Sequence, residues 1–356
     1  MRIERSHFGH TPPGHPVTRF TLYNDRGTSV GIINLGAAVQ SIRVPDREGV
    51  FDDIVLGYAD TEGYWHDAHY MGAVIGRYAN RIARGRFTLD DTVYALSRNH
   101  GAHHLHGGLV GFDKHLWKAE PAQSGDRIVL TLNRVSDHGE EGYPGNLSVT
   151  VTYSLNNANE LRIQYRAVTD RATPVNLTHH GYFNLSGNHN TAIDSHIVWI
   201  NADYFLPVDA DFIPTGEIAP VADTPLDFRQ PTAIQERIDG SHVQLERVGG
   251  YDHNWILNAY DGGVKRQASV YHEDSGRLME VDTSAPGLQF YSGNFLHSRF
   301  LGKNRRPCRR RQGLCLETQH FPNSPNQPQF PSTILRPGET YRSETVYRFL
   351  LTSDNH

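Results

Sequence analysis

The chain has 356 residues, and its 34 basic residues nearly balance its 39 acidic ones, which gives a formal charge of −5. This length is enough for one large all-β domain or two ordinary ones, and the balanced charge does not indicate nucleic acid or an anionic membrane as a partner. Only two cysteines are present, Cys308 and Cys315, no window is apolar enough to span a membrane, and the N-terminus lacks the apolar core of a signal peptide. We therefore expect a cytoplasmic protein with reduced cysteines and a small, nearly neutral partner.

Strand-like runs bounded by Gly, Asn, Asp or Pro follow one another along the chain, whereas long stretches with helical periodicity are hard to find. The runs that we predict as strands are Thr18–Tyr23, Ala38–Val44, Ile128–Asn133, Leu147–Leu155, Leu161–Thr169, Thr173–His180, Ala268–His272, Leu278–Ser284, Leu288–Ser292 and Glu339–Leu351. The break at Asn156-Asn157 predicts a hairpin. No repeat, linker or abrupt change in composition divides the chain, so we predict an all-β fold with one large antiparallel β-sandwich domain over residues 1–356.

Two polar clusters occur early in the chain. Asn80 and Arg81 stand side by side after an apolar run, although Arg81 could equally be a surface cation. The stretch 99–108 holds four histidines in seven positions, and the two glycines after His106 let the backbone turn sharply, which suits a side chain projected into a cleft. The cluster lacks the paired cysteines or the helical His-x-x-x-His that make a zinc site specific. We therefore predict His106 as a site residue and no metal.

In residues 174–185, an extended conformation places polar and aromatic side chains on one face and mostly apolar ones on the other. The polar face carries Asn176, Thr178, His180, Tyr182 and Asn184, and the other carries Val175, Leu177, His179, Gly181 and Phe183. A strand that lines a sugar pocket needs such a polar face, because sugars bind through polar groups on their edges and aromatic contact on their C–H faces. We therefore predict His180 as a site residue and His179 as a structural one.

Two weaker signals follow. Asp252 comes shortly after the pair Gly249-Gly250, where it could be a site residue or a turn former. The run from Lys303 to Arg311 contains five arginines. We interpret this run as a solvated loop and not as a nucleic-acid patch, because the chain as a whole is acidic and no aromatic residues interleave there.

The strand-like residues 313–319 present one carboxylate on a chosen face. Alternation puts Leu314 and Leu316 on one side and Cys315 and Glu317 on the other. A proline-rich stretch follows at once, so the strand ends soon after Glu317. Glutamate side chains are usually solvated, but the presence of the other polar motifs in the chain favours Glu317 as a catalytic carboxylate.

Taken together, these segments resemble the aldose 1-epimerases, or galactose mutarotases. The likeness covers nearly the whole chain and includes Gly-Ala-Val-Ile-Gly-Arg (72–77), Ala-Asn-Arg-Ile (79–82), Leu-His-Gly-Gly (105–108), Thr-Pro-Val-Asn-Leu-Thr (173–178), Tyr-Ser-Gly-Asn-Phe-Leu (291–296) and Leu-Glu-Thr-Gln (316–319). The resemblance implies the family's large twisted antiparallel β-sandwich, of the supersandwich type. The chain departs from it at His179, where relatives often have Asn, and at Gly181, where they often have Ser.

The resemblance also implies a chemistry, which is interconversion of the α and β anomers of a free hexose such as galactose or glucose without a cofactor. Glu317 matches the family's base, His180 its acid, and His106 a second histidine. The positions that match substrate-binding residues are Asn80, Arg81, Asp252 and Gln289.

Other functions stay open on the sequence. A glycoside hydrolase usually needs two carboxylates, whereas here the partner of Glu317 is a histidine. An epimerase of hexose 6-phosphates would need a cationic clamp, which the arginine-rich run could supply, and a sugar-binding paralogue without activity is a third alternative. We expect a small-molecule sugar as the partner, no nucleic acid, no membrane, and a monomer or homodimer.

Overall fold

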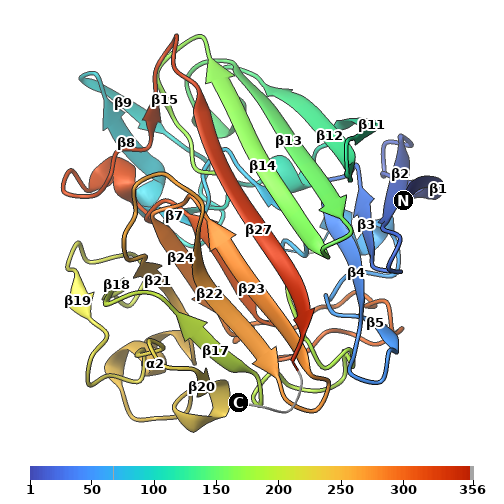
Figure 1. Ribbon diagram of the computed structural model, residues 1–356. Helices are drawn as coiled ribbons and strands as arrows, with labels where there is room; N and C mark the ends of the chain where they lie inside the picture. The colour runs from blue at the N-terminus through green and yellow to red at the C-terminus, as the bar shows by residue number, and fades with distance from the viewer. Residues whose placement is uncertain (67, 353–356) are drawn as a thin grey trace.

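The computed structural model describes residues 1–66 and 68–352. Most of its regular structure is antiparallel β-sheet, and the largest sheet has nine strands and crosses the whole molecule (Figure 1). In spatial order its strands are β11 (Lys118–Ser124), β12 (Arg127–Ser136), β13 (Leu147–Asn156), β14 (Glu160–Thr169), β27 (Tyr341–Leu351), β23 (Arg277–Thr283), β22 (Lys265–His272), β17 (Ile197–Ile200) and β20 (Thr232–Ala233).

Two five-stranded sheets complete the main architecture. The first comes from the N-terminal part of the chain and contains β1 (Arg2–His10), β2 (Pro16–Tyr23), β3 (Ser29–Ile33), β4 (Val39–Pro45) and β5 (Phe51–Asp53). The second comes from the C-terminal half and contains, in spatial order, β19 (Ala219–Pro220), β18 (Tyr204–Leu206), β21 (Asp252–Ile256), β24 (Gly287–Tyr291) and β25 (Cys315–Gln319).

Four short strand pairs and a few helical turns connect these sheets. The pairs are β7 (Arg81–Ile82) with β10 (His104–Leu105), β6 (Val74–Ile75) with β16 (Thr178–His179), β15 (Thr173–Pro174) with β26 (Ile334–Leu335), and β8 (Arg86–Leu89) with β9 (Thr92–Ala95). The helices are α1 (Thr61–His66) and α2 (Val243–Val248), with 3-10 turns η1 (Ala83–Gly85), η2 (Phe112–Lys114), η3 (Glu140–Gly142), η4 (Ile234–Glu236) and η5 (Ser324–Asn326). Among the described residues, no helix has the length and apolar character needed to cross a membrane.

One apolar core holds the three large sheets together. The same cluster of buried side chains includes Ile32 of the first five-stranded sheet, Val151 and Ile163 of the nine-stranded sheet, and Phe290 and Leu316 of the second five-stranded sheet. Burial of apolar surface is the main favourable contribution to folding, so this shared core fixes the sheets against one another.

The predicted all-β class is confirmed, and most predicted strands occur within one or two residues of their expected ends. The predicted hairpin is formed by β13 and β14. At its turn, Asn156 Oδ1 accepts hydrogen bonds from the backbone N–H groups of Ala158 and Glu160, each at 3.0 Å, and Asn159 takes a left-handed φ of 58°. The prediction of a single domain over residues 1–356 stays a prediction.

The predicted strand Thr173–His180 is not continuous. Only β15 and β16 pair as strands, and Asn176 between them forms an isolated bridge with Tyr78. The segment changes partner along its length, from β26 to Tyr78 to β6, because it runs through two short strand pairs and not along one of the three large sheets.

Candidate active site

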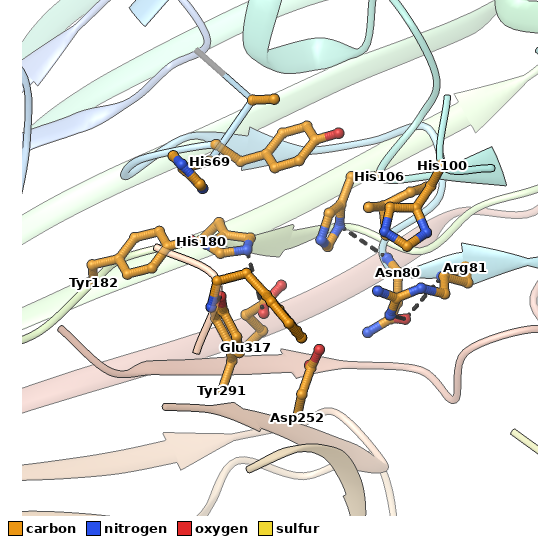
Figure 2. A pocket seen from close by; sticks show the side chains of 14 residues that line it. His69, Asn80, Arg81, His100, His106, His180, Tyr182, Asp252, Tyr291 and Glu317 are labelled. Carbon is orange, nitrogen blue, oxygen red and sulfur yellow. Dashed lines mark hydrogen bonds and ion pairs between the residues drawn. The ribbon is translucent and has the colours of Figure 1, made fainter. Parts of the chain in front are cut away.

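A cavity of about 220 Å³ opens at the junction of the short pairs and the second five-stranded sheet. Six of the seven predicted site residues line it, and Figure 2 shows them facing one another. The complete lining is Ala68, His69, Tyr70, Asn80, Arg81, His100, Leu105, His106, His180, Tyr182, Asp252, Tyr291, Phe295 and Glu317.

A tight backbone junction positions Asn80 and His106. Both residues have left-handed φ angles, 63° and 51°, and the N–H of His106 donates to the carbonyl of Asn80 at 3.0 Å. In return the N–H of Asn80 donates to His106 Nδ1 at 3.1 Å (Figure 2). Because Nδ1 accepts a hydrogen bond here, the neutral ring carries its proton on Nε2. Burial lowers the pKa of His106 well below its usual value, so the ring is a neutral donor.

His180 reaches the cavity from the residue directly after β16. Its backbone is held on both sides, because its N–H donates to Ala73 at 2.9 Å and its carbonyl accepts from Gly72 at 2.8 Å. The predicted division of faces is confirmed here, since His180 lines the cavity while the His179 ring contacts Tyr347, a member of the apolar core.

Glu317 lies in the middle of β25, beside Gln289 on β24. The side chain is 2% exposed, and its Oε2 has no hydrogen-bond partner among the described residues. Gln289 Nε2 donates to Asp252 Oδ1 at 2.7 Å, at the start of β21. Adjacent strands therefore bring a free carboxylate oxygen and a second, hydrogen-bonded carboxylate to one wall of the cavity.

The closest acid and base in the cavity are Glu317 and His180, with 3.6 Å between Oε1 and Nε2 (Figure 2). Burial raises the pKa of Glu317 well above its usual value, and the nearby Asp252 raises it further, whereas Arg81 lowers it. Burial also lowers the pKa of His180 to about 3. Both shifts favour the neutral forms of the two groups.

Arg81 is a buried cation. The residue is only 7% exposed, so the alternative interpretation of Arg81 as a surface cation is wrong. Its charge lowers the pKa values of Asp252 and Glu317, against the larger effect of burial that raises both. Arg81 thus favours ionised carboxylates in this cavity.

Three sequence interpretations are corrected or refined by these positions. Asp252 is the first residue of a strand and not a turn former. Gln289 is not among the residues that line the cavity, but its Nε2 donates to Asp252, which does line it. The arginine-rich run forms a loop as expected, but Arg311 is paired with Asp239, with 2.6 Å between Nη2 and Oδ1.

Sequence reasoning missed several residues of the site. Tyr70 packs its ring against both His106 and His180, with ring centroids 4.7 and 5.9 Å apart. No local pattern singled it out, because it lies in a turn with a left-handed φ of 55°. Phe295 also lines the cavity, and its motif was part of the resemblance without a role being assigned to it.

Asn176 connects two backbone segments next to the site. Its Nδ2 donates to the carbonyls of Ala79 and His320 at 3.3 and 3.2 Å, and its Oδ1 accepts from the N–H of His320 at 2.9 Å. Ala79 precedes Asn80, and His320 follows β25, so one amide joins two segments that carry site residues.

Ligand atoms of His106, His180 and Glu317 all lie within 4.8 Å of one another, which is close enough for a metal ion. A histidine that binds a metal through Nε2 carries its proton on Nδ1 and donates it to a neighbour. In His106 the opposite holds, because Nδ1 accepts from the backbone of Asn80. The tautomer therefore opposes a metal at this cluster.

The model of the aldose 1-epimerase family matches residues 18–348. The chain belongs to the aldose 1-epimerase family. Galactose mutarotase from Mus musculus is 47% identical over 350 residues, which cover 98% of this chain and 99% of the mouse protein. Aldose 1-epimerase from Escherichia coli is 42% identical over 341 residues, which cover 95% and 97% of the two chains.

Solved structures agree with this membership. The crystal structure of galactose 1-epimerase from Lactobacillus acidophilus superposes with a TM-score of 0.87 at 27% identity and covers 99% of both chains. The likeness to this β-sandwich fold confirms the predicted supersandwich, and membership makes the chain an isomerase of the mutarotase type.

Proposed function

We propose that this aldose 1-epimerase interconverts the α and β anomers of free hexoses such as galactose and glucose, with Glu317 as base and His180 as acid. The observation that carries this assignment is the buried pair of Glu317 and His180 at 3.6 Å, facing a small cavity lined by polar groups. A cavity of about 220 Å³ is small for a ligand site, and it suits a single sugar ring.

Ring opening starts from the charged forms of the pair, and Arg81 favours the carboxylate form of Glu317. Glu317 as carboxylate takes the proton of the C1 hydroxyl, the bond between C1 and the ring oxygen breaks, and His180 as imidazolium gives its proton to that oxygen. The product is the open-chain aldehyde, and the pair is left as carboxylic acid and neutral imidazole. Burial favours these neutral forms of both groups.

Reclosure uses the same groups in reverse. Rotation about the C1–C2 bond exposes the other face of the aldehyde, after which His180 takes the proton of the C5 hydroxyl and Glu317 gives one to the carbonyl oxygen. Both groups return to their starting forms, so no reagent is consumed. Net charge is unchanged throughout, because the proton only moves within the pair and the sugar.

The remaining cavity residues would orient the sugar and stabilise the charged forms of Glu317 and His180. His106 is a donor at Nε2, Arg81 is a cation, and the carboxylate of Asp252 accepts hydrogen bonds from hydroxyls. Asn80 holds His106 in place, and Gln289 holds Asp252. We propose these as binding or positioning roles.

A sugar phosphate is a poorer fit than a free sugar. Arg81 is the only Arg or Lys in the cavity lining of the described chain, and Asp252 and Glu317 place two carboxyl groups beside it. A phosphate group would therefore meet repulsion inside the cavity. We propose the cytoplasm as the location, because the chain has only two cysteines and both are buried.

The test is the rate of anomerisation of α-glucose and α-galactose, measured by polarimetry with the spontaneous rate subtracted. We expect Glu317→Gln and His180→Asn each to lower kcat by ~10²-fold or more while the fold is retained, because each removes a proton-transfer group. Exposed Glu120→Gln and His15→Asn serve as matched controls with unchanged rates. A Glu317→Gln enzyme that keeps more than about a tenth of kcat would contradict the assignment.

A further inference from the structure

The turn at residues 209–213 carries Phe212 in a left-handed conformation, with φ at 65°. Asp209 shapes this turn, since its Oδ1 accepts hydrogen bonds from the N–H groups of Asp211 and Ile213 at 2.9 and 3.0 Å. A bulky side chain in this region of backbone space is an outlier that costs free energy. The contacts of the Phe212 ring show what this conformation achieves.

The half-buried ring of Phe212 touches three residues of the cavity lining without lining the cavity itself. The guanidinium carbon of Arg81 lies over the ring, 5.2 Å from its centroid. Phe295 stacks on the ring at 5.7 Å with an interplanar angle of 24°, and the ring of His100 lies 6.3 Å away. Phe212 therefore packs against side chains of the cavity wall.

A second contact ties the turn to the segment that follows Arg81. Asp211 Oδ2 lies 3.5 Å from Nε2 of His103. His103 Nδ1 accepts a hydrogen bond from the N–H of Arg84 at 3.0 Å, so the neutral ring carries its proton on Nε2, facing Asp211. The turn is thus anchored to the chain three residues after Arg81.

The guanidinium of Arg81 has few other contacts. Its Nη1 is 3.5 Å from Asn80 Oδ1, which is a weak contact, and its Nε has no hydrogen-bond partner among the described residues. An aromatic face attracts a cation through its quadrupole and uses none of the N–H donors. A carboxylate partner would hold the cation more firmly, but it would occupy the donors that a ligand needs.

We propose that Phe212 is a positioning residue, which holds the Arg81 guanidinium at the cavity wall while leaving its N–H donors free for the oxygens of the sugar. This inference rests on the proposed function. It adds Phe212, which lies outside the cavity lining, to the residues that position the binding groups. It also gives the left-handed turn at 209–213 a role in binding or catalysis.

The first test compares Phe212→Leu with Phe212→Tyr in the anomerisation assay. Loss of the ring removes the contact with the cation, so kcat/KM should fall by about 2- to 30-fold for Phe212→Leu, the range expected for cation–π interactions. Phe212→Tyr keeps the ring and should stay within about twofold of the wild type. Tyr260→Leu, a change of an exposed ring outside the site, should leave kcat/KM unchanged.

The second test separates positioning from stability. Phe212→Gly removes the ring and also relieves the left-handed backbone, so its Tm should not fall by more than a degree or two while kcat/KM drops as for Phe212→Leu. In an Arg81→Met background, where no cation remains to be positioned, Phe212→Leu should change kcat/KM less than twofold.

Two results would overturn the proposal. One is a Phe212→Leu enzyme with wild-type kcat/KM, and the other is a loss that is equally large with and without Arg81. A wild-type protein that fails to anomerise any aldose would instead overturn the proposed function, so the two failures are distinguishable.

Discussion

His179 and His180 are neighbours in sequence that lie in different surroundings. His180 faces Glu317 in the cavity, whereas the ring of His179 packs against Tyr347, with 6.1 Å between ring centroids. Burial favours the neutral form of both rings, because it lowers the pKa of His179 to about 4 and that of His180 to about 3. Because the two side chains make different contacts, we expect their substitution to have different effects on the protein.

We expect His180→Ala to lower kcat strongly with little loss of stability, because its contacts serve the cavity. His179→Ala should cost about 1–3 kcal/mol of unfolding free energy and affect turnover far less, since it removes a buried ring from the core. Denaturant unfolding and anomerisation rates of the two purified variants check this. An inactive His179→Ala beside a normal His180→Ala would show that the assignment of faces is wrong.

The His179 ring lies directly beside Gly181. A Cβ added at Gly181 would meet Cε1 of the His179 ring at 2.7 Å. The histidine ring therefore occupies the space that a side chain at position 181 would need.

We expect Gly181→Ser to destabilise the protein by about 1–3 kcal/mol, because the new side chain overlaps the ring. In a His179→Asn background the same change should cost clearly less, since the smaller side chain leaves room. A double-mutant cycle of unfolding free energies measures the difference. Equal costs in the two backgrounds would show that the contact does not couple the positions.

At the scale of elements, the junction of β7 and β10 shapes one side of the cavity. Arg81 and Leu105 pair across this junction, so Asn80 and His106 leave it side by side. The turn continues through Gly107, whose φ is 91°. A Cβ there would lie only 1.9 Å from the carbonyl oxygen of Gly76, so no side chain fits.

We expect Gly107→Ala to cost about 3 kcal/mol or more and to lower activity, because the backbone that carries His106 must move. Gly101→Ala is the matched control, as its φ of 59° is also left-handed but its Cβ would meet open space. That control should cost only about 1 kcal/mol and leave kcat unchanged. The measurements are unfolding free energies and rates, and similar costs at both positions would refute the steric argument.

At the scale of the whole molecule, several buried histidines are neutral. The clearest are His196 and His253, whose pKa values burial lowers to about 3. His196 Nε2 accepts from the N–H of Leu185 at 2.8 Å and Nδ1 lies 3.1 Å from the carbonyl of Ile193. Protonation of Nε2 would turn that acceptor into a donor facing another donor, so the folded state resists it.

The sign of the pH effect follows from proton counts. Between about pH 6.5 and 3 the unfolded chain protonates these histidines and the folded chain does not, so the unfolding free energy falls as pH falls. Each such histidine contributes at most about 1.4 kcal/mol per pH unit. The raised pKa values of Glu317 and Asp252 act in the opposite direction. The histidines whose pKa is strongly lowered are more numerous, because they also include His104, His179, His180 and His320.

We therefore expect the protein to be clearly less stable at pH 5 than at pH 7. His196→Gln should be less stable than the wild type at pH 7, yet lose less stability on acidification, because one titrating group is gone. The exposed His15→Asn should keep the wild-type slope. Denaturant unfolding at several pH values measures these slopes, and an unchanged slope for His196→Gln would count against the mechanism.

The sequence by itself determined the strand-rich class, the hairpin of β13 and β14, and the faces of His180 and Glu317. These are local properties. Side chains alternate along an extended backbone with a period of two, so a pattern of polar and apolar residues states which of them face a core. The family motifs likewise lie within short stretches of chain.

Only the tertiary structure decided which of these faces meet. Asp252 is the first residue of a strand, Gln289 donates a hydrogen bond to it, and the ring of Phe212 lies against the guanidinium of Arg81. Such contacts join residues that are far apart in sequence, and they depend on strand pairing and core packing over the whole chain. Local patterns carry no information on those distances, because sheet register and burial fix them only when the chain folds.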